Sequence, residues 1–336
     1  MEHNIAAYKL QYQWFVLYIK DILGKTPVDF SWKVRWRMRN DRNPLFTEIQ
    51  DKYKVKEYAK ARGVTSAEVY QVTDDPDTID FGSLPNEYFI KANHGCGWNL
   101  FGKNGEFYNF KYGKDADVDV NYANCRITRE ECVTLCKKWL KKRYSHREWA
   151  YRNIEPMILI EESLVQKGGD FLIDYRCHTF NGVVKAVEID SPMFKNNEGM
   201  IVDRNGKPFR LTHYKYKFPD PPHEIPGDFR EIVLAAEKLG KGLDYIRVDL
   251  YNTTKGIALG EMTIYPYGGG MNIPTGCPIF DRWLGEQWVL PKPSGRGGGR
   301  RIPEGSRRLV VSPAFPCDDP KSAASCPMKM AKGDAR

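Results

Sequence analysis

Two segments of alternating residue type, 245–251 and 257–264, flank the polar run Asn252-Thr253-Thr254-Lys255. Alternation over this length predicts two β-strands, and the short polar run predicts that they pair as a hairpin. In such a strand the apolar side chains point to one face and the polar side chains to the other. This hairpin constrains the fold most, because it decides which polar side chains can lie together.

Four polar residues of the hairpin would share a face if the connecting loop were odd. Arg247 and Asp249 lie on one face of the first strand, and Glu261 and Thr263 lie on one face of the second. A loop of three or five residues would place all four on the same side of the sheet. Two carboxylates and a hydroxyl supply hard oxygen ligands for Mg²⁺, and the arginine would hold an oxyanion. The alternative is a surface hairpin with a cross-strand Arg–Glu pair.

A glycine-containing turn follows another expected strand, 87–92. That strand includes Lys91, and the turn reads His94-Gly95-Cys96-Gly97-Trp98-Asn99. Small residues let backbone N–H groups approach phosphate oxygens, and a nearby lysine supplies charge. The turn is neither a GxxxxGK[ST] loop nor a GxGxxG motif, so alone it does not define a phosphate site. We interpret His94 as a hydrogen-bonding loop residue rather than a general base.

An apolar strand is expected at 157–162, ending in Glu161 and Glu162. A strand that ends at such a hinge can present backbone groups to an adenine edge. The alternative is a strand capped by solvated glutamates. No Ser/His/Asp or Cys/His arrangement suggests a protein nucleophile.

The other patterns predict helices and strands in alternation. Helices are expected at 5–23, 43–63, 128–143 and 228–239. Further strands are expected at 68–72, 171–180 and 183–189, the last two joined by Asn181-Gly182. Segment 191–226 is expected to be a long loop.

Two local patterns carry further expectations. Asp228 and Glu231 form a capping-box pair, and Gly240 suits the C′ position of the helix that they begin. The basic and apolar residues of 33–39 are interpreted as a solvated, half-buried face rather than as a basic edge for an anionic partner.

The net charge of +8 is concentrated at the C-terminal end. Residues 291–336 hold ten Lys/Arg and four Asp/Glu, which leaves a net charge of only +2 for the rest. A nearly neutral body argues against a nucleic-acid-binding protein. The same 46 residues hold seven Pro, six Gly and five Ser, so we expect a disordered tail.

No segment predicts a membrane span, because the most apolar run, 10–19, is about half the required length. The first residues show no secretory signal. The eight cysteines form no CxxC pair, and Cys132 and Cys136 are interpreted as thiols on a helix face. Free thiols favour a reducing cytoplasm as the location.

Together these features resemble the ATP-grasp superfamily, and most closely its TupA-like branch, which is associated with teichuronopeptide and other cell-surface polymer biosynthesis. The matching stretches are Asp41-Arg42-Asn43-Pro44-Leu45, Asp51-Lys52-Tyr53, Lys91 to Asn99, Arg147-Glu148-Trp149, Ile160-Glu161-Glu162, Asp174-Tyr175-Arg176, Phe180-Asn181-Gly182, Arg247 to Tyr251 and Gly260 to Pro266. The resemblance implies an α+β / α/β chain with the ATP-grasp fold, in which two α+β subdomains clasp ATP beside an N-terminal α/β unit.

The implied organisation has four parts. A helical and α/β region occupies 1–85, and a small subdomain with the glycine-rich loop occupies 86–164. A large subdomain with the metal site occupies 165–290, and the basic tail occupies 291–336.

The resemblance also implies the residues that bind ATP. Lys52 and Lys91 resemble the lysines that contact the phosphates, and the turn at 93–99 resembles the loop that covers them. Asp174 stands where a carboxylate binds ribose, with Asp170 as a competitor. The implied ATP-binding set is Lys52, Lys91, His94, Gly95, Gly97, Glu161, Glu162, Leu164 and Asp174.

The implied catalytic residues are Arg247, Lys91 and Arg176, the last of which replaces a lysine that is common in this branch. Asp249 and Glu261 resemble the Mg²⁺ carboxylates. Thr263 stands where the wider superfamily often has asparagine and is a weaker third ligand.

The function implied is an ATP- and Mg²⁺-dependent carboxylate–amine ligase. ATP would phosphorylate a carboxylate, and an amine would displace phosphate from the acyl phosphate to give an amide and ADP. The substrates would be an amino acid and a uronic-acid or peptide-like acceptor, in polysaccharide or peptide natural-product biosynthesis. Two alternatives use the same site: a kinase that phosphorylates a hydroxyl of a sugar-like or small molecule, and a degenerate nucleotide-binding module.

Overall fold

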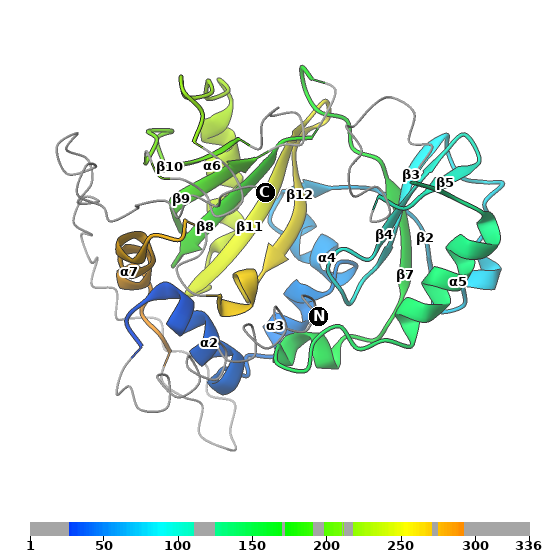
Figure 1. The fold of residues 1–336 in the computed structure, drawn as a ribbon, viewed down its shortest axis with the longest axis horizontal. Helices are drawn as coiled ribbons and strands as arrows, with labels where there is room; N and C mark the ends of the chain where they lie inside the picture. The colour runs from blue at the N-terminus through cyan, green and yellow to red at the C-terminus, as the bar shows by residue number, and fades with distance from the viewer. Residues whose placement is uncertain are drawn as a thin grey trace, which may run out of the picture.

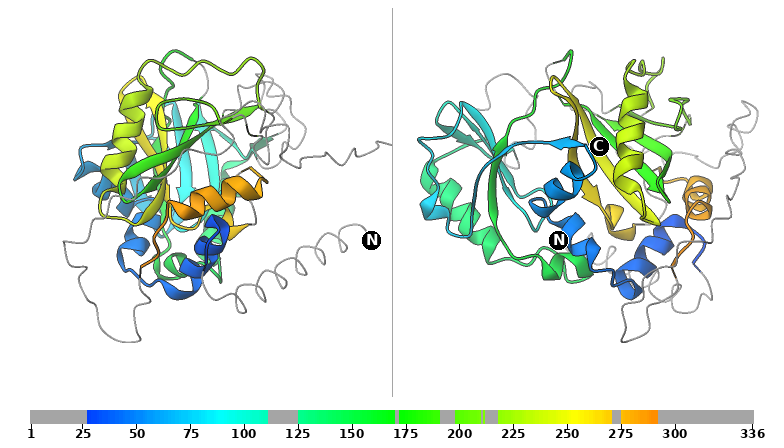
Figure 2. Two further views of the ribbon diagram at one scale, coloured as in Figure 1. Left: turned by 90° about the vertical axis from the view of Figure 1, so that its left-hand side faces the viewer. Right: turned by 180° about the vertical axis from the view of Figure 1, so that it is seen from behind.

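The computed structural model describes residues 27–110, 125–169, 172–190, 198–209, 211, 218–270 and 275–291. Its strands form two six-stranded sheets, with helices α3 (Leu45–Gln50) and α4 (Lys54–Lys60) between them (Figures 1 and 2). The expected helix at 5–23, the competitor Asp170 and the tail beyond residue 291 lie outside the described residues. None of the helices in the described ranges is both long and apolar enough to cross a membrane.

Sheet I carries the predicted hairpin. Its strand order is β1 (Thr65–Ser66), β12 (Gly256–Thr263), β11 (Tyr245–Thr253), β8 (Asp174–Phe180), β9 (Val183–Asp190) and β10 (Gly199–Val202). All neighbours are antiparallel except β1 and β12. Helix α6 (Phe229–Gly240) packs its apolar face on this sheet, so the opposite face is left for the polar side chains.

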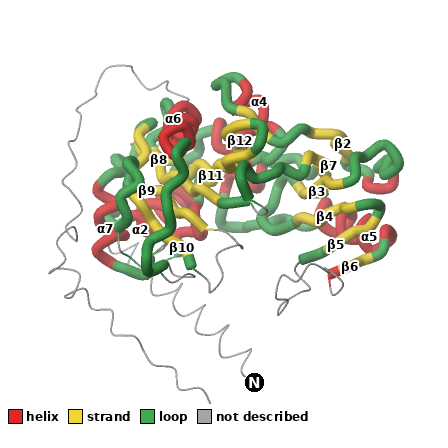
Figure 3. The backbone as a smooth tube through the Cα atoms, turned by 90° about the horizontal axis from the view of Figure 1, so that it is seen from above, coloured by secondary structure: helices red, strands yellow, loops and turns green. Residues whose placement is uncertain are grey.

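Sheet II contains the strand that ends in the glycine-rich turn. Its order is β2 (Val69–Thr73), β7 (Ile158–Glu162), β3 (Glu87–Ala92), β4 (Asn99–Lys103), β5 (Glu106–Tyr108) and β6 (Arg126–Ile127), all antiparallel. Helix α5 (Arg129–Leu140) packs against it. Cys132 and Cys136 are fully buried on this helix, which confirms their interpretation as helix-face thiols. Seen from above, the two sheets occupy separate halves of the molecule (Figure 3).

The first described helix, α2 (Phe30–Asn40), packs on α7 (Pro278–Glu286). The expectation of a solvated basic face at 33–39 is wrong. Arg37 is completely buried. Its Nη1 donates to the Tyr245 carbonyl at 2.8 Å, and its guanidinium lies 4.4 Å from the Trp288 ring centroid. The pattern is helical, so its basic residues do not share one face.

The expected continuous helix at 43–63 is also wrong, because the chain breaks between α3 and α4. Asp51 Oδ1 accepts hydrogen bonds from the Tyr53 amide at 2.8 Å and from Asn93 Nδ2 at 3.1 Å. Side chains of this kind offer the backbone an alternative to helix. The break places Lys52, whose amide donates to the Asn93 carbonyl at 3.2 Å, beside the glycine-rich turn.

Three expectations around α6 and β9 need correction. The capping box does not form, because the Asp228 carboxylate accepts from Lys167 at 3.0 Å and from Asn252 at 2.7 Å instead. Gly242, with φ of 86°, takes the left-handed conformation expected of Gly240. The supposed loop at 191–226 contains β10, which pairs with β9.

The hairpin forms with a different loop from the one expected. Thr253 pairs with Gly256, so the loop has an even length. Gly260 is an extra residue opposite the junction of Asp249 and Leu250, which makes a β-bulge there. The bulge changes the register by one and brings the polar residues of both strands onto one face.

Replacing Gly260 with alanine is expected to destabilise the protein by about 1–3 kcal/mol. An added Cβ would lie 2.5 Å from Tyr251 Cε2 and 3.3 Å from the Asp249 carbonyl oxygen, so the ring must move. Chemical denaturation measures the effect. Gly227→Ala is the matched control, because its Cβ would meet nothing within 4 Å. Equal stability of the two variants would contradict the close approach at the bulge.

Candidate active site

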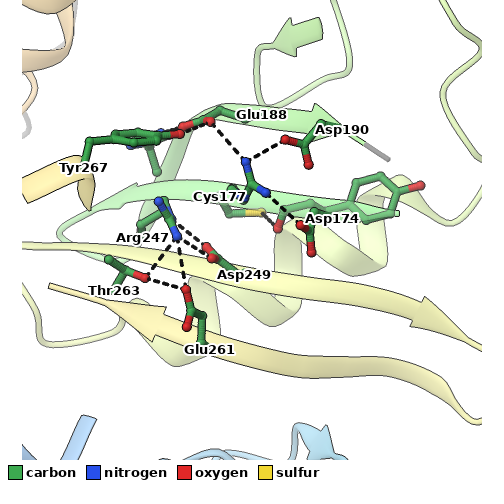
Figure 4. Close-up of polar contacts among 12 residues, drawn as sticks. Asp174, Cys177, Glu188, Asp190, Arg247, Asp249, Glu261, Thr263 and Tyr267 are labelled. Carbon is green, nitrogen blue, oxygen red and sulfur yellow. Dashed lines mark hydrogen bonds and ion pairs between the residues drawn. The ribbon is translucent and has the colours of Figure 1, made fainter. Parts of the chain in front are cut away.

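The polar face of sheet I carries a row of charged side chains across four strands. Arg176 on β8 pairs in register with Glu188 on β9 and with Asp249 on β11. Asp249 in turn pairs with Glu261 on β12. The row therefore brings three carboxylates and one guanidinium side by side (Figure 4).

Arg247 joins the four predicted hairpin residues into one cluster. Its Nε and Nη2 donate to the two oxygens of Asp249 at 2.7 and 2.5 Å. Nη2 also lies 3.4 Å from Glu261 Oε1 and 3.1 Å from Thr263 Oγ1. Arg247 and Asp249 are buried, at 7% and 4% exposure. The alternative of a surface hairpin is therefore wrong.

Lys52 reaches this cluster from the break between α3 and α4. Its Nζ lies 2.6 Å from Glu261 Oε2. The ammonium group of Lys52 holds the pKa of Glu261 well below its ordinary value. Burial instead raises the pKa of Asp249 to about 7, against the opposing effect of Arg247. The two carboxylates thus differ in how readily they take up a proton.

A second cluster lies on sheet II. Glu161 accepts from Lys91 at 2.5 Å and from Lys56 at 2.8 Å. Burial alone would raise the pKa of Glu161, but the two lysines lower it to about 2. At 6% exposure Glu161 is not a solvated cap. Its neighbour Glu162 accepts from the Glu68 amide at 3.2 Å and pairs with Lys255 in the hairpin turn.

The link after β7 ties the two sheets together. The Thr254 amide donates to the Val165 carbonyl at 3.0 Å, and the Lys167 amide donates to the Asn252 carbonyl at 2.9 Å. Leu164, expected near adenine, lies in this link. Although burial lowers the pKa of Lys52, its pairing with Glu261 raises it, with a net rise.

The glycine-rich turn is shaped by close contacts. A Cβ on Gly95 would lie 2.4 Å from the Trp98 ring, and Gly97 has φ of 66°, so both positions require glycine. His94 is buried, with its ring nitrogens 3.0 Å from Asn93 Oδ1 and 3.1 Å from the Trp139 carbonyl. These contacts favour the hydrogen-bonding role of His94 over general-base catalysis.

Arg176 is held by carboxylates on two strands. It donates to Asp174 and to Asp190 at 2.7 Å each, and lies 4.0 Å from Glu188. The sequence did not point to Glu188 or Asp190. A register shift between His178 and the next residue turns Glu188 to the face of Arg176, whereas the two-residue Asn-Gly turn alone would place it on the other face.

The oxygen donors of the hairpin fit a magnesium site. Asp249, Glu261 and Thr263 present two carboxylates and a hydroxyl, and Thr263 Oγ1 donates to Glu261 Oε1 at 3.3 Å. Among the described residues no three His, Cys, Asp or Glu side chains gather as a metal site. Two carboxylates suffice for Mg²⁺ when phosphates and waters complete its ligands.

The two sheets bring lysines, an arginine and paired carboxylates together, as the resemblance to the ATP-grasp superfamily implies. The family described as TupA-like ATPgrasp matches residues 32–289, and the chain belongs to that family. The fold and family predicted from the sequence are confirmed. The predicted enzyme class, an ATP-grasp ligase, accords with membership of this family.

Solved structures show a distant likeness. D-alanine–D-alanine ligase from Bacillus anthracis, complexed with ATP, is 12% identical with a TM-score of 0.36, over 65% of this chain and 54% of that one. D-cycloserine synthetase DcsG is 16% identical with a TM-score of 0.37, over 73% and 72%. The ATP-grasp ligase PsnB, complexed with minimal precursor, Mg and ADP, is 14% identical with a TM-score of 0.36, over 73% and 60%.

The chain thus spans little more than half the length of the D-alanine–D-alanine ligase. No match was found among curated proteins.

Proposed function

We propose that the chain is an ATP- and Mg²⁺-dependent ligase that joins a carboxylate to an amine through an acyl phosphate and releases ADP. The observation that carries the proposal is the meeting of Lys52, Arg247, Asp249 and Glu261 in one partly buried cluster. Phosphoryl transfer needs stabilisation of negative charge on the γ-phosphoryl group rather than a protein nucleophile. This cluster supplies both cations and metal-binding carboxylates.

Each group has a distinct task. Lys52 and Lys91 bind phosphate oxygens, and the backbone around Gly95 and Gly97 covers them. Asp249, Glu261 and Thr263 would hold Mg²⁺, which when bound supplies positive charge to the phosphates. Arg247 neutralises the oxyanion that forms when the amine attacks, and Arg176 places further positive charge beside it.

The nucleotide would lie between the sheets. Glu161, Glu162 and Leu164 lie where the chain passes from sheet II to sheet I and would hold adenine, and Asp174 would bind ribose. The subdomain limits at 85, 164 and 290 stay part of this proposal. The link between the sheets at 163–167 supports the limit at 164.

The family suggests the substrates: an amino acid as the amine and a uronic-acid or peptide-like acceptor. Both would be small molecules. A cytoplasmic location accords with the six cysteines of the described residues, all of which are free thiols.

Product analysis tests the reaction. Purified protein is incubated with ATP, Mg²⁺ and pools of carboxylates, with hydroxylamine in place of the amine. We expect ADP and phosphate, and capture of the acyl phosphate as a hydroxamate. Release of AMP would indicate adenylate chemistry, and a stable phosphate ester would favour the kinase.

Lys91→Ala and Lys52→Ala are each expected to weaken ATP binding, because a charge-assisted phosphate contact contributes about 1.5–3 kcal/mol. Calorimetry with a non-hydrolysable ATP analogue measures the loss. Lys56→Ala is the matched control for Lys91, because both lysines pair with Glu161 and each variant leaves one partner in place. Equal ATP affinity of the Lys91 and Lys56 variants would rule out a phosphate contact by Lys91.

A further inference from the structure

The turn after β12 holds Tyr267 in a backbone conformation that tyrosine rarely adopts. Tyr267 has φ of 56° and ψ of 17°, and Gly268 and Gly269 also have positive φ. Among the described residues the other non-glycine residues with positive φ are Asn104 and Asn181. Asparagine tolerates this region, whereas a bulky residue is strained in it. Such strain persists where surrounding contacts enforce it, and it clusters at functional sites.

Contacts with helix α2 hold the turn in this conformation. Arg35 Nη1 donates to the Gly269 carbonyl at 2.6 Å. A Cβ on Gly269 would lie 2.6 Å from Arg35 Cγ and 3.3 Å from the Ser31 carbonyl oxygen. The turn therefore has no room to relax toward the helix, and Tyr267 is directed at sheet I.

Tyr267 contacts a buried carboxylate with its hydroxyl, and its ring lies beside Arg247 (Figure 4). Its hydroxyl donates to Glu188 Oε2, and its ring centroid lies 5.4 Å from the Arg247 guanidinium carbon. Glu188 is 1% exposed, and its other oxygen lies 2.5 Å from His178 Nε2. The tyrosine is thus anchored on a fixed carboxylate and offers its ring face to the arginine.

The charges around Arg247 explain why such a residue is needed. Arg247 pairs with Asp249 and lies near Glu261, while Glu188 lies just beyond the tyrosine. Burial raises the pKa of Tyr267 well above its ordinary value, so its hydroxyl stays a donor to Glu188. The ring attracts the guanidinium, and the hydrogen bond of the hydroxyl to Glu188 fixes the ring beside it.

We propose that Tyr267 is a positioning residue that holds Arg247 on Asp249. It thereby sets how strongly Arg247 competes with a divalent cation for Asp249. The proposal rests on the proposed function only in assigning Asp249 and Glu261 to the metal. It predicts that loss of the tyrosine side chain strengthens metal binding, whereas a merely structural role would weaken it or leave it unchanged.

Binding of Mn²⁺ to the full chain without nucleotide, followed by electron paramagnetic resonance, tests this. Tyr267→Gly keeps the backbone conformation and removes both contacts, and we expect about tenfold tighter Mn²⁺ binding. Tyr267→Phe keeps the ring and should stay within about threefold of wild type. At a pH well above 7, where Asp249 stays ionised, Arg247→Met should also tighten binding. Adding Tyr267→Gly to it should have no further effect, because the tyrosine acts through the arginine.

Asn181→Gly is the matched control, since it relieves a left-handed residue at the distant turn between β8 and β9 and should leave Mn²⁺ affinity unchanged. If the glycine variant does not fold, Tyr267→Asn replaces it. Unchanged or weaker Mn²⁺ binding by the folded Tyr267 variant would overturn the positioning role while leaving the metal site intact. So would an equal gain in Mn²⁺ affinity when Tyr267→Gly is added to Arg247→Met. Absence of Mn²⁺ binding in wild type and Arg247→Met, even with a non-hydrolysable ATP analogue, would overturn both proposals.

Discussion

Arg247→Ala is expected to lower the rate of amide formation about 10²–10³-fold, while the affinity for a non-hydrolysable ATP analogue changes little. Loss of one donor to a developing oxyanion typically has an effect of this size. The arginine is buried and makes a two-point contact with Asp249, so its guanidinium is already fixed before substrates bind. Steady-state rates and calorimetry on the same preparations separate the two effects.

Two controls isolate the role of the arginine. Arg247→Lys keeps the charge but loses the planar fork, so its rate should fall between those of wild type and Arg247→Ala. Because Arg247 opposes the rise in the pKa of Asp249, Arg247→Ala favours protonation of that carboxyl. Rates should therefore be compared at saturating Mg²⁺ and at a pH well above 7. Full activity of Arg247→Ala under these conditions would exclude its role at the oxyanion.

Local patterns predicted much of the fold, because strand alternation and turn residues act over short distances. The strand at 87–92 and the hairpin turn Asn181-Gly182 are confirmed. The helix expected at 128–143 forms as α5 with a capping box at Thr128. Alternation also identified the hairpin residues, since Arg247 and Asp249 do share a face.

Register was harder to predict, because one extra residue reverses every side chain beyond it. The four hairpin residues come together through the bulge at Gly260 rather than through an odd loop. A second register shift after His178 turns Glu188 toward Arg176. An isolated glycine such as Gly260 inside a strand is a signal of a bulge, whereas nothing in the sequence marks the shift after His178.

Tertiary contacts account for the remaining differences. The break at Asp51 depends on Asn93, which is distant in sequence and supplies a donor to that carboxylate. Lys56 was missed because its pairing with Glu161 becomes visible only when α4 lies against β7. Tyr267 was missed because nothing in the sequence indicates that its backbone is held by α2.

The cations in the site carry a further consequence. Glu261 is paired with Lys52 and Asp249 with Arg247, so the proposed metal carboxylates are also the resting partners of the proposed phosphate and oxyanion groups. Neutralising either carboxylate should therefore weaken metal binding and, at the same time, release the lysine or arginine that is paired with it. This coupling makes the carboxylate variants the sharpest test of the hairpin.

Asp249→Asn and Glu261→Gln are each expected to lower turnover at least 10–100-fold and to raise the Mg²⁺ concentration needed for half-maximal rate. Replacing a residue that only supports a metal ligand typically lowers metal affinity or activity about 10–100-fold, so replacing a direct ligand should lower them at least as much. The two variants should differ in nucleotide binding without metal. Glu261→Gln releases Lys52 and should strengthen nucleotide binding. Asp249→Asn leaves Lys52 paired and should not strengthen it. Glu237→Gln is the control, because it neutralises an ion-paired carboxylate of α6, across the sheet from the site. Unchanged Mg²⁺ dependence in both site variants would show that the hairpin does not hold the metal.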